Sequence, residues 1–160
     1  MPNPDEPDIA EWVHLIKIGV GKTDKNTFFV GHSIGCQTIL RFLEQLNDEE
    51  RAGGAVFVAP WLHLNTAAYD NETDMAIAKP WLETPINWKS VLKHAQRFSA
   101  IFSDNDPYVP IADSKIFKDK IGADIIIESG KGHMNEESGI TKLERILSET
   151  LKMAGESGNI

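Results

Sequence analysis

Residues 27–36 read TFFVGHSIGC, and they are the most informative stretch of this 160-residue chain. The first four are β-branched or aromatic, which predicts a short strand over 27–30. A Gly-x-Ser-x-Gly pattern follows at 31–35, and apolar side chains then recur at helical spacing through residue 46. A strand, a tight glycine turn and a helix together are typical of a nucleophile elbow, which raises a serine above the end of a sheet.

The two glycines of this pattern, Gly31 and Gly35, have a physical reason. A strand that turns sharply into a helix holds Ser33 in a strained backbone conformation, and side chains two residues before and after it would collide. The start of the following helix also favours negative charge that develops beside the serine. A second interpretation is a glycine-rich turn in which Ser33 only caps the helix.

Strand and helix patterns alternate along the rest of the chain. The apolar run 55–59 has no alternation, as expected for a strand buried on both faces. Further strands are expected at 98–102 and 125–127, and further helices at 9–16, 88–95, 113–121 and 140–151. This alternation predicts an α/β fold, with a parallel sheet and helices on both faces.

The domain organisation is simple. The length fits a single domain over 1–160. We expect an irregular start at 1–7, an irregular stretch at 60–88 and a frayed tail at 154–160.

Composition narrows the classes of function. Lys and Arg number 16 against 24 Asp and Glu, and the resulting charge of −8 argues against a nucleic-acid partner. No apolar run approaches the roughly 18 residues of a membrane span, so no membrane partner is expected. Residues 1–7 are unlike a signal peptide, and a single cysteine, Cys36, suits a reducing compartment. We therefore expect a cytoplasmic protein.

Candidate site residues follow the later strands, because sites of such sheets lie beyond the carboxyl ends of the strands. The strand at 98–102 runs into a loop that holds Asp104 and Asp106. Asp106 begins a D-x-x-V-P pattern and is the favoured acid, with Asp104 as the alternative. Of five histidines, only His133 lies on a loop directly after a late strand. Ser33, the acid and His133 thus occur in the chain order of an α/β-hydrolase triad.

At this point the motifs resemble a known family. GHSIGC at 31–36, SDNDPYVP at 103–110 and GKGHMN at 130–135 resemble the small serine hydrolases of the retinoblastoma-binding protein 9 and YdeN-like family. KPW at 79–81 and PINW at 85–88 resemble that family's Trp-rich segment. The resemblance implies a three-layer α/β-hydrolase-like fold with a flavodoxin-like strand order. It also implies Ser33 as nucleophile, Asp106 as acid and His133 as base.

The chain departs from this family at its N-terminus. Family members begin with a core strand and a Gly-rich loop that this chain is expected to lack, which makes the domain N-terminally shortened. That loop would supply one of two oxyanion donors, and the amide of Ile34 would supply the other. The strand at 27–30 would then have an open edge, which invites a dimer or a protein partner. A truncated gene model, a fragment and a shortened homologue all fit this expectation.

Two hypotheses of function follow. The first is a serine hydrolase that cleaves an ester or amide of a small substrate and needs no cofactor or metal. The second is a catalytically impaired hydrolase-fold module, or a fragment, that binds a protein. Three tryptophans, Trp61, Trp81 and Trp88, either line an acyl pocket or pack a long loop onto the sheet. Cys36 is expected to be a small buried residue rather than a nucleophile.

Overall fold

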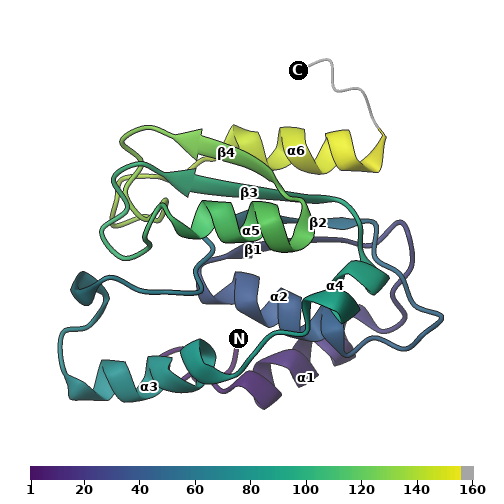
Figure 1. Cartoon of the computed structure of the whole chain (residues 1–160), viewed down its shortest axis with the longest axis horizontal. Coiled ribbons are helices and arrows are strands. Elements are labelled where there is room, and N and C mark those ends of the chain that lie inside the picture. Colours follow the sequence, from purple (N-terminus) through teal and green to yellow (C-terminus); the bar gives the residue numbers. More distant parts are fainter. Residues whose placement is uncertain (156–160) are drawn as a thin grey trace.

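The computed structural model describes residues 1–155, and its centre is a four-stranded parallel sheet (Figure 1). The strands are β1 (Phe28–His32), β2 (Gly54–Val58), β3 (Phe98–Ser103) and β4 (Asp124–Glu128). They pair in the order of the chain, β1-β2-β3-β4, so each new strand is added at the same edge of the sheet. This one-directional order matches part of a flavodoxin-like sheet. The predicted α/β class is confirmed.

Helices cover both faces of the sheet, but unequally. The helices are α1 (Ile9–Val20), α2 (Ile34–Glu44), α3 (Glu72–Glu83), α4 (Trp88–His94), α5 (Asp113–Ile121) and α6 (Glu144–Ala154), with a short 3₁₀ helix η1 (Thr66–Ala68). Each right-handed crossover leads to the next strand in the same direction across the sheet. The connecting helices α2, α4 and α5 therefore lie on one face of the sheet. The last helix, α6, packs on the opposite face, and α1 packs against α2 on its outer side (Figure 1).

The core lies mainly between the sheet and the α2 side. Every residue of β2 and β3 is buried, as predicted for central parallel strands. On the α2 side, the rings of Phe57 and Phe102 each pack edge-on against Phe117 of α5. A smaller cluster under α6 contains Val56, Val58, Ala59, Ile101, Met134 and Met153.

The expectation that residues 60–88 are wholly irregular is wrong, because they contain η1 and α3. Asn71 caps α3 by accepting hydrogen bonds from the amides of Thr73 and Asp74. Pro80 lies inside this helix, where its ring and its missing N–H disfavour helical backbone. The helix persists because its buried Trp81 is held by tertiary contacts to Arg41, Pro7 and Trp12.

The last helix begins later than the pattern indicated. The expected start at residue 140 is replaced by turns, in which the amide of Ile140 bonds to the carbonyl of Asn135 and Gly139 has a positive φ of 74°. The helix then runs on through Ala154, so the expected fraying at 154 is wrong, while residues 156–160 lie outside the described residues.

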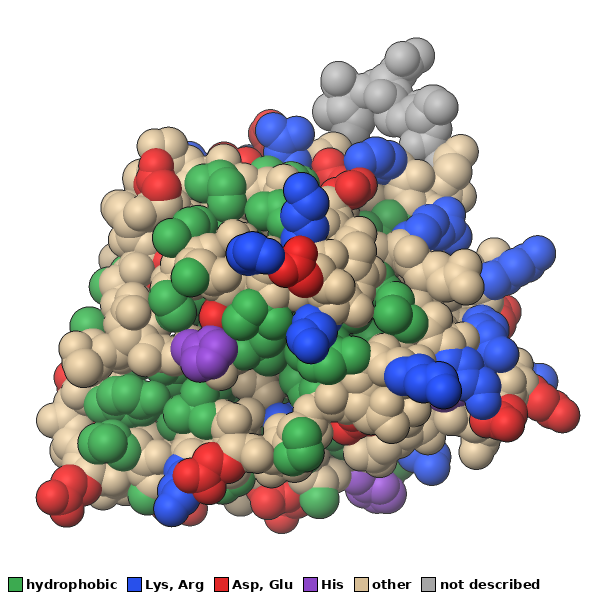
Figure 2. Space-filling model, in the orientation of Figure 1, with side chains coloured by type: hydrophobic (Ala, Val, Ile, Leu, Met, Phe, Trp, Pro, Cys, Tyr) green, Lys and Arg blue, Asp and Glu red, His purple; other side chains and the backbone are tan. Residues whose placement is uncertain are grey.

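The two outer strands expose apolar side chains. β1 pairs with β2 alone among residues 1–155, and its Val30 is 49% exposed. Figure 2 shows that hydrophobic side chains also gather on the viewed face between α5 and α3, with charged side chains of both signs around them. Within residues 1–155, no helix combines the length and the apolar character that a membrane crossing requires.

Candidate active site

The serine of the glycine pattern lies at a sharp turn between β1 and α2. Ser33 has φ 51° and ψ −123°, a conformation that a residue with a side chain rarely adopts. A Cβ at Gly31 would lie 2.7 Å from Cδ1 of Ile39 and 3.0 Å from the amide nitrogen of Cys36. A side chain at position 31 would therefore be crowded by the turn, which favours glycine there.

The second glycine of the pattern, Gly35, is not crowded in this way. A Cβ added at Gly35 would meet no atom within 4 Å outside the backbone of its own helix, so the expected collision at this position is wrong. Ser33 stands at the N-cap position of α2, but its side chain makes no capping hydrogen bond. The interpretation of Ser33 as a simple helix cap is therefore not supported.

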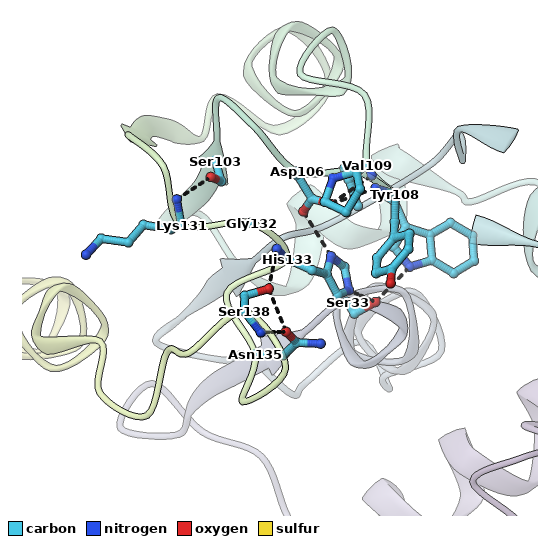
Figure 3. Close-up of polar contacts among 12 residues, drawn as sticks. Ser33, Ser103, Asp106, Tyr108, Val109, Lys131, Gly132, His133, Asn135 and Ser138 are labelled. Carbon is cyan, nitrogen blue, oxygen red and sulfur yellow. Dashed lines mark hydrogen bonds and ion pairs between the residues drawn. The ribbon is translucent and has the colours of Figure 1, made fainter. Parts of the chain in front are cut away.

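Three side chains from three strand ends meet in one hydrogen-bonded chain (Figure 3). Oγ of Ser33 is 3.0 Å from Nε2 of His133, and Nδ1 of the same imidazole is 2.9 Å from Oδ2 of Asp106. A carboxylate only accepts, so Nδ1 carries the proton and Nε2 is left to accept from the serine hydroxyl. The serine hydroxyl and the imidazole are thus within the distance over which a proton can be transferred.

The surroundings of the two aspartates distinguish them. The side chain of Asp106 is only 2% exposed, and its Oδ1 accepts from the amides of Tyr108 and Val109 at 2.9 and 3.1 Å. Asp104 instead accepts from the amide of Gly130 and the hydroxyl of Ser129. The Gly130 amide lowers the pKa of Asp104, followed by the Ser129 hydroxyl. Asp104 therefore ties two loops together while Asp106 faces the imidazole.

The loop that carries His133 is held from several sides (Figure 3). Its amide donates to Oγ of Ser138, which in turn donates to Oδ1 of Asn135. The ring of Tyr108 packs edge-on against the imidazole, with centroids 5.1 Å apart. None of these supporting residues was singled out in the sequence: Tyr108 lies on a different loop from His133, and the local bonds of Ser138 and Asn135 match no recognised motif.

His32 also contacts this loop. Its Nε2 is 2.8 Å from the carbonyl oxygen of His133, and the two rings pack edge-on. Since a carbonyl only accepts, Nε2 of His32 is the donor. Desolvation of its ring lowers the pKa of His32, and the bond to the His133 carbonyl opposes that shift. Although the residue as a whole is exposed, His32 is therefore a donor that supports the backbone of His133.

A cleft of about 210 Å³ opens beside the serine. It is lined by Ser33, Ile34, Trp61, Leu64, Ala68, Tyr108 and His133. The amide of Ile34 is at the first position of α2, where no intrahelical acceptor exists and the helix dipole is positive. This amide is suited to bind a developing oxyanion.

Of the three tryptophans, the structure brings only Trp61 to the cleft. The indole of Trp81 is buried against Trp12 and donates to the carbonyl of Pro7. Trp88 packs edge-on against Phe117. The pocket-lining role expected for Trp81 and Trp88 is therefore corrected to one of packing helices together.

Two further features bear on the chemistry. Cys36 is fully buried, and this burial raises the pKa of its thiol far above the ordinary value, so it is not a nucleophile. Among residues 1–155, no group of three His, Cys, Asp or Glu side chains is arranged to hold a metal ion.

Comparison with known proteins assigns the chain to a family. The model of the serine hydrolase family matches residues 1–151. The chain belongs to the serine hydrolase family. Within it, the chain is 27% identical over 143 residues to YdeN of Bacillus subtilis (strain 168), which is named as a hydrolase. That alignment covers 89% of this chain and 72% of YdeN.

Solved structures agree with this membership. The crystal structure of the Bacillus subtilis ydeN gene product superposes with a TM-score of 0.81 at 27% identity, over 98% of this chain and 80% of that one. A YdeN-like hydrolase from Pectobacterium atrosepticum has a TM-score of 0.66 at 17% identity, over 94% and 71% of the two chains, and shares the fold. The expected resemblance is confirmed.

Proposed function

We propose that this serine hydrolase cleaves an ester or amide bond of a small substrate through an acyl-enzyme formed on Ser33. The observation that carries the proposal is the continuous chain from Ser33 Oγ through the His133 imidazole to Asp106. Three residue types that follow separate strands meet with both hydrogen bonds at 3.0 Å or less. A nucleophile, a base and an orienting acid within such reach are the pattern of covalent catalysis by serine.

The acylation step follows from these positions. Oγ of Ser33 attacks the substrate carbonyl carbon, its proton passes to Nε2 of His133, and the carbonyl electron pair moves onto oxygen. The amide of Ile34 donates to that oxyanion. Collapse restores the carbonyl, expels the alcohol or amine, and returns the proton from Nε2 to the leaving group. Asp106 holds the imidazole in the required tautomer and stabilises the imidazolium.

Deacylation repeats the sequence with water. His133 takes a proton from water, whose oxygen attacks the acyl carbon, and the proton then returns to Oγ of Ser33 as the acid leaves. The cleft at the serine is smaller than the roughly 300–1,000 Å³ of sites for drug-sized ligands, which supports a small substrate. None of its lining side chains is Asp, Glu, Lys or Arg, which favours an uncharged acyl group.

The test is covalent labelling with a fluorophosphonate, read by intact mass and peptide mapping. We expect one adduct, on Ser33, and none on Ser33→Ala. Hydrolysis of p-nitrophenyl acetate should fall to the background rate in the same variant. Labelling that persists in Ser33→Ala, or a cooperatively folded wild-type chain that neither labels nor turns over ester, would contradict the proposal.

A further inference from the structure

The indole of Trp61 contacts the same oxygen that the triad activates. Its Nε1–H donates to Oγ of Ser33 at 3.3 Å. Trp61 follows β2, is only 3% exposed and forms part of the cleft wall beside Ser33 and Ile34. The sequence left Trp61 as either an acyl-pocket residue or a residue that packs a loop onto the sheet, and this polar contact belongs to neither role.

The segment that carries Trp61 is anchored through its main chain. Just before it, Ala59 has a positive φ of 45°, which is rare for a residue with a side chain. The carbonyl of Trp61 accepts from Nε2 of Gln37, a side chain of α2 that is 1% exposed. The loop therefore leaves β2 in a strained turn and is bound at once to the helix of the nucleophile.

A second buried polar group anchors the next residues. Asp113, at the start of α5 and 1% exposed, accepts from the amides of Leu62 and His63 at 2.6 and 2.9 Å. Its other oxygen is 2.7 Å from Nδ1 of His63. Buried polar groups are costly unless they are bonded, so these contacts hold the loop in one conformation. The indole is therefore presented to Ser33 by a rigid support.

We propose that Trp61 is a catalytic residue whose indole N–H binds Oγ of Ser33 through the chemical steps. The proposal rests on the serine hydrolase function proposed above. A hydroxyl has one donor and two acceptor positions. With the indole donating to one lone pair, the hydroxyl proton is free to point at Nε2 of His133, which is the productive orientation for its transfer.

The same contact stabilises the transition state more than the ground state. As Oγ loses its proton to His133 and begins to bond carbon, it carries more negative charge than in the hydroxyl. A hydrogen bond to a charged oxygen is shorter and about twice as strong as one to a neutral oxygen. The rather long contact of 3.3 Å should tighten at that moment, and only such differential binding accelerates the step. The indole keeps its proton throughout.

The decisive variant is Trp61→Phe, with Trp88→Phe as the matched control. Phenylalanine keeps an aromatic ring but removes the N–H, and the Gln37 bond survives because it uses the carbonyl of residue 61. Trp88 lies away from the cleft, against Phe117. We expect kcat for p-nitrophenyl acetate and the fluorophosphonate labelling rate to fall about 10-fold in Trp61→Phe. KM and the pH midpoint of labelling should stay unchanged, and Trp88→Phe should match the wild type.

A second substitution separates loss of the N–H from loss of ring shape. With 3-benzothienylalanine at position 61, sulfur replaces only the N–H of the bicyclic ring, and the same 10-fold loss is expected. Wild-type rates in both Trp61 variants, while the wild type labels at Ser33, would overturn the role of Trp61 and leave the proposed function intact. A full rate with benzothienylalanine but not with Phe would also overturn it, because ring shape would then be the cause. A wild type that does not label would overturn the proposed function itself.

Discussion

At the scale of single residues, the two aspartates of the loop after β3 differ in what they bind. Asp106 is buried against His133, whereas Asp104 is exposed and joins Gly130 and Ser129. Their proximity along the chain left the acid ambiguous in the sequence. The direction in which each carboxylate points favours Asp106 as the proposed acid.

Replacement of each aspartate by asparagine tests this assignment. Asp106→Asn should lower the labelling rate at Ser33 by about 10⁴-fold, because the amide favours the wrong imidazole tautomer. Asp104→Asn should keep a rate within a few fold of the wild type. Rates of fluorophosphonate labelling at fixed pH measure both. Equal losses in the two variants would contradict the assignment of Asp106.

His32 makes stability depend on pH. Its pKa lies below the ordinary value of 6.5 in the folded chain, so the unfolded chain binds a proton first as pH falls. Stability is therefore lost as pH decreases below about 6.5. His32→Gln keeps a donor for the His133 carbonyl but does not titrate. As the pH falls from 7.5 to 5, we expect the melting temperature of His32→Gln to rise relative to that of the wild type. A difference between the two melting temperatures that stays constant with pH would refute this role.

At the scale of elements, the junction of β1 and α2 shows which glycine the elbow needs. The backbone of Ser33 is strained, and the space behind the turn is filled by Ile39 and by the amide of Cys36. The sequence motif treats Gly31 and Gly35 alike. Packing distinguishes them, since only Gly31 faces the interior of the turn.

Alanine at each glycine provides a matched pair. Gly31→Ala should lose about 1–3 kcal/mol of unfolding free energy, because the new methyl group overpacks the turn. Gly35→Ala should instead gain roughly 0.5–1 kcal/mol, as expected for Gly to Ala inside a helix. Urea unfolding followed by circular dichroism gives both values. Similar losses of unfolding free energy in the two variants would show that the close contacts at Gly31 do not cause the loss in Gly31→Ala.

At the scale of the whole molecule, one buried cation connects helices that are distant in sequence. Arg41 of α2 is 1% exposed, and its Nη2 donates to Gln37 and to the carbonyls of Trp81 and Thr84. The indole of Trp81 in turn bonds to the carbonyl of Pro7. Through this network α2 holds α3 and the start of the chain, which explains why a helix with an internal proline persists.

Removal of that cation should weaken the molecule without altering the chemistry. In Arg41→Met the carbonyls of Trp81 and Thr84 lose their donor inside the protein, and we expect a loss of about 2–4 kcal/mol in unfolding free energy. The labelling rate of the folded variant at Ser33 should stay within about two-fold. Thermal and urea unfolding measure the first effect. Unchanged stability would mean that Arg41 does not join these helices energetically.

Local patterns along the chain were enough for the sheet, for most of the helices and for naming the three residues whose side chains meet in one hydrogen-bonded chain. Neighbours within a few residues define the strand at 27–30, the helix at 113–121 and the three short motifs that hold Ser33, Asp106 and His133. Backbone propensity, side-chain periodicity and turn chemistry act over that distance. The structure places these elements within one to three residues of the expected positions, except for the later end of α1 and the later start of α6.

Contacts between distant segments required the folded molecule. The bond from Trp61 to Ser33 spans 28 residues, that from His32 to His133 spans 101, and the burial of Trp81 depends on Arg41 and Pro7. No local pattern encodes such pairs, because their free energy comes from desolvation and geometry that exist only once the layers have packed. For the same physical reason, residue types along the chain indicate a triad, whereas the contact between the Trp61 indole and Ser33 exists only once the distant segments have packed.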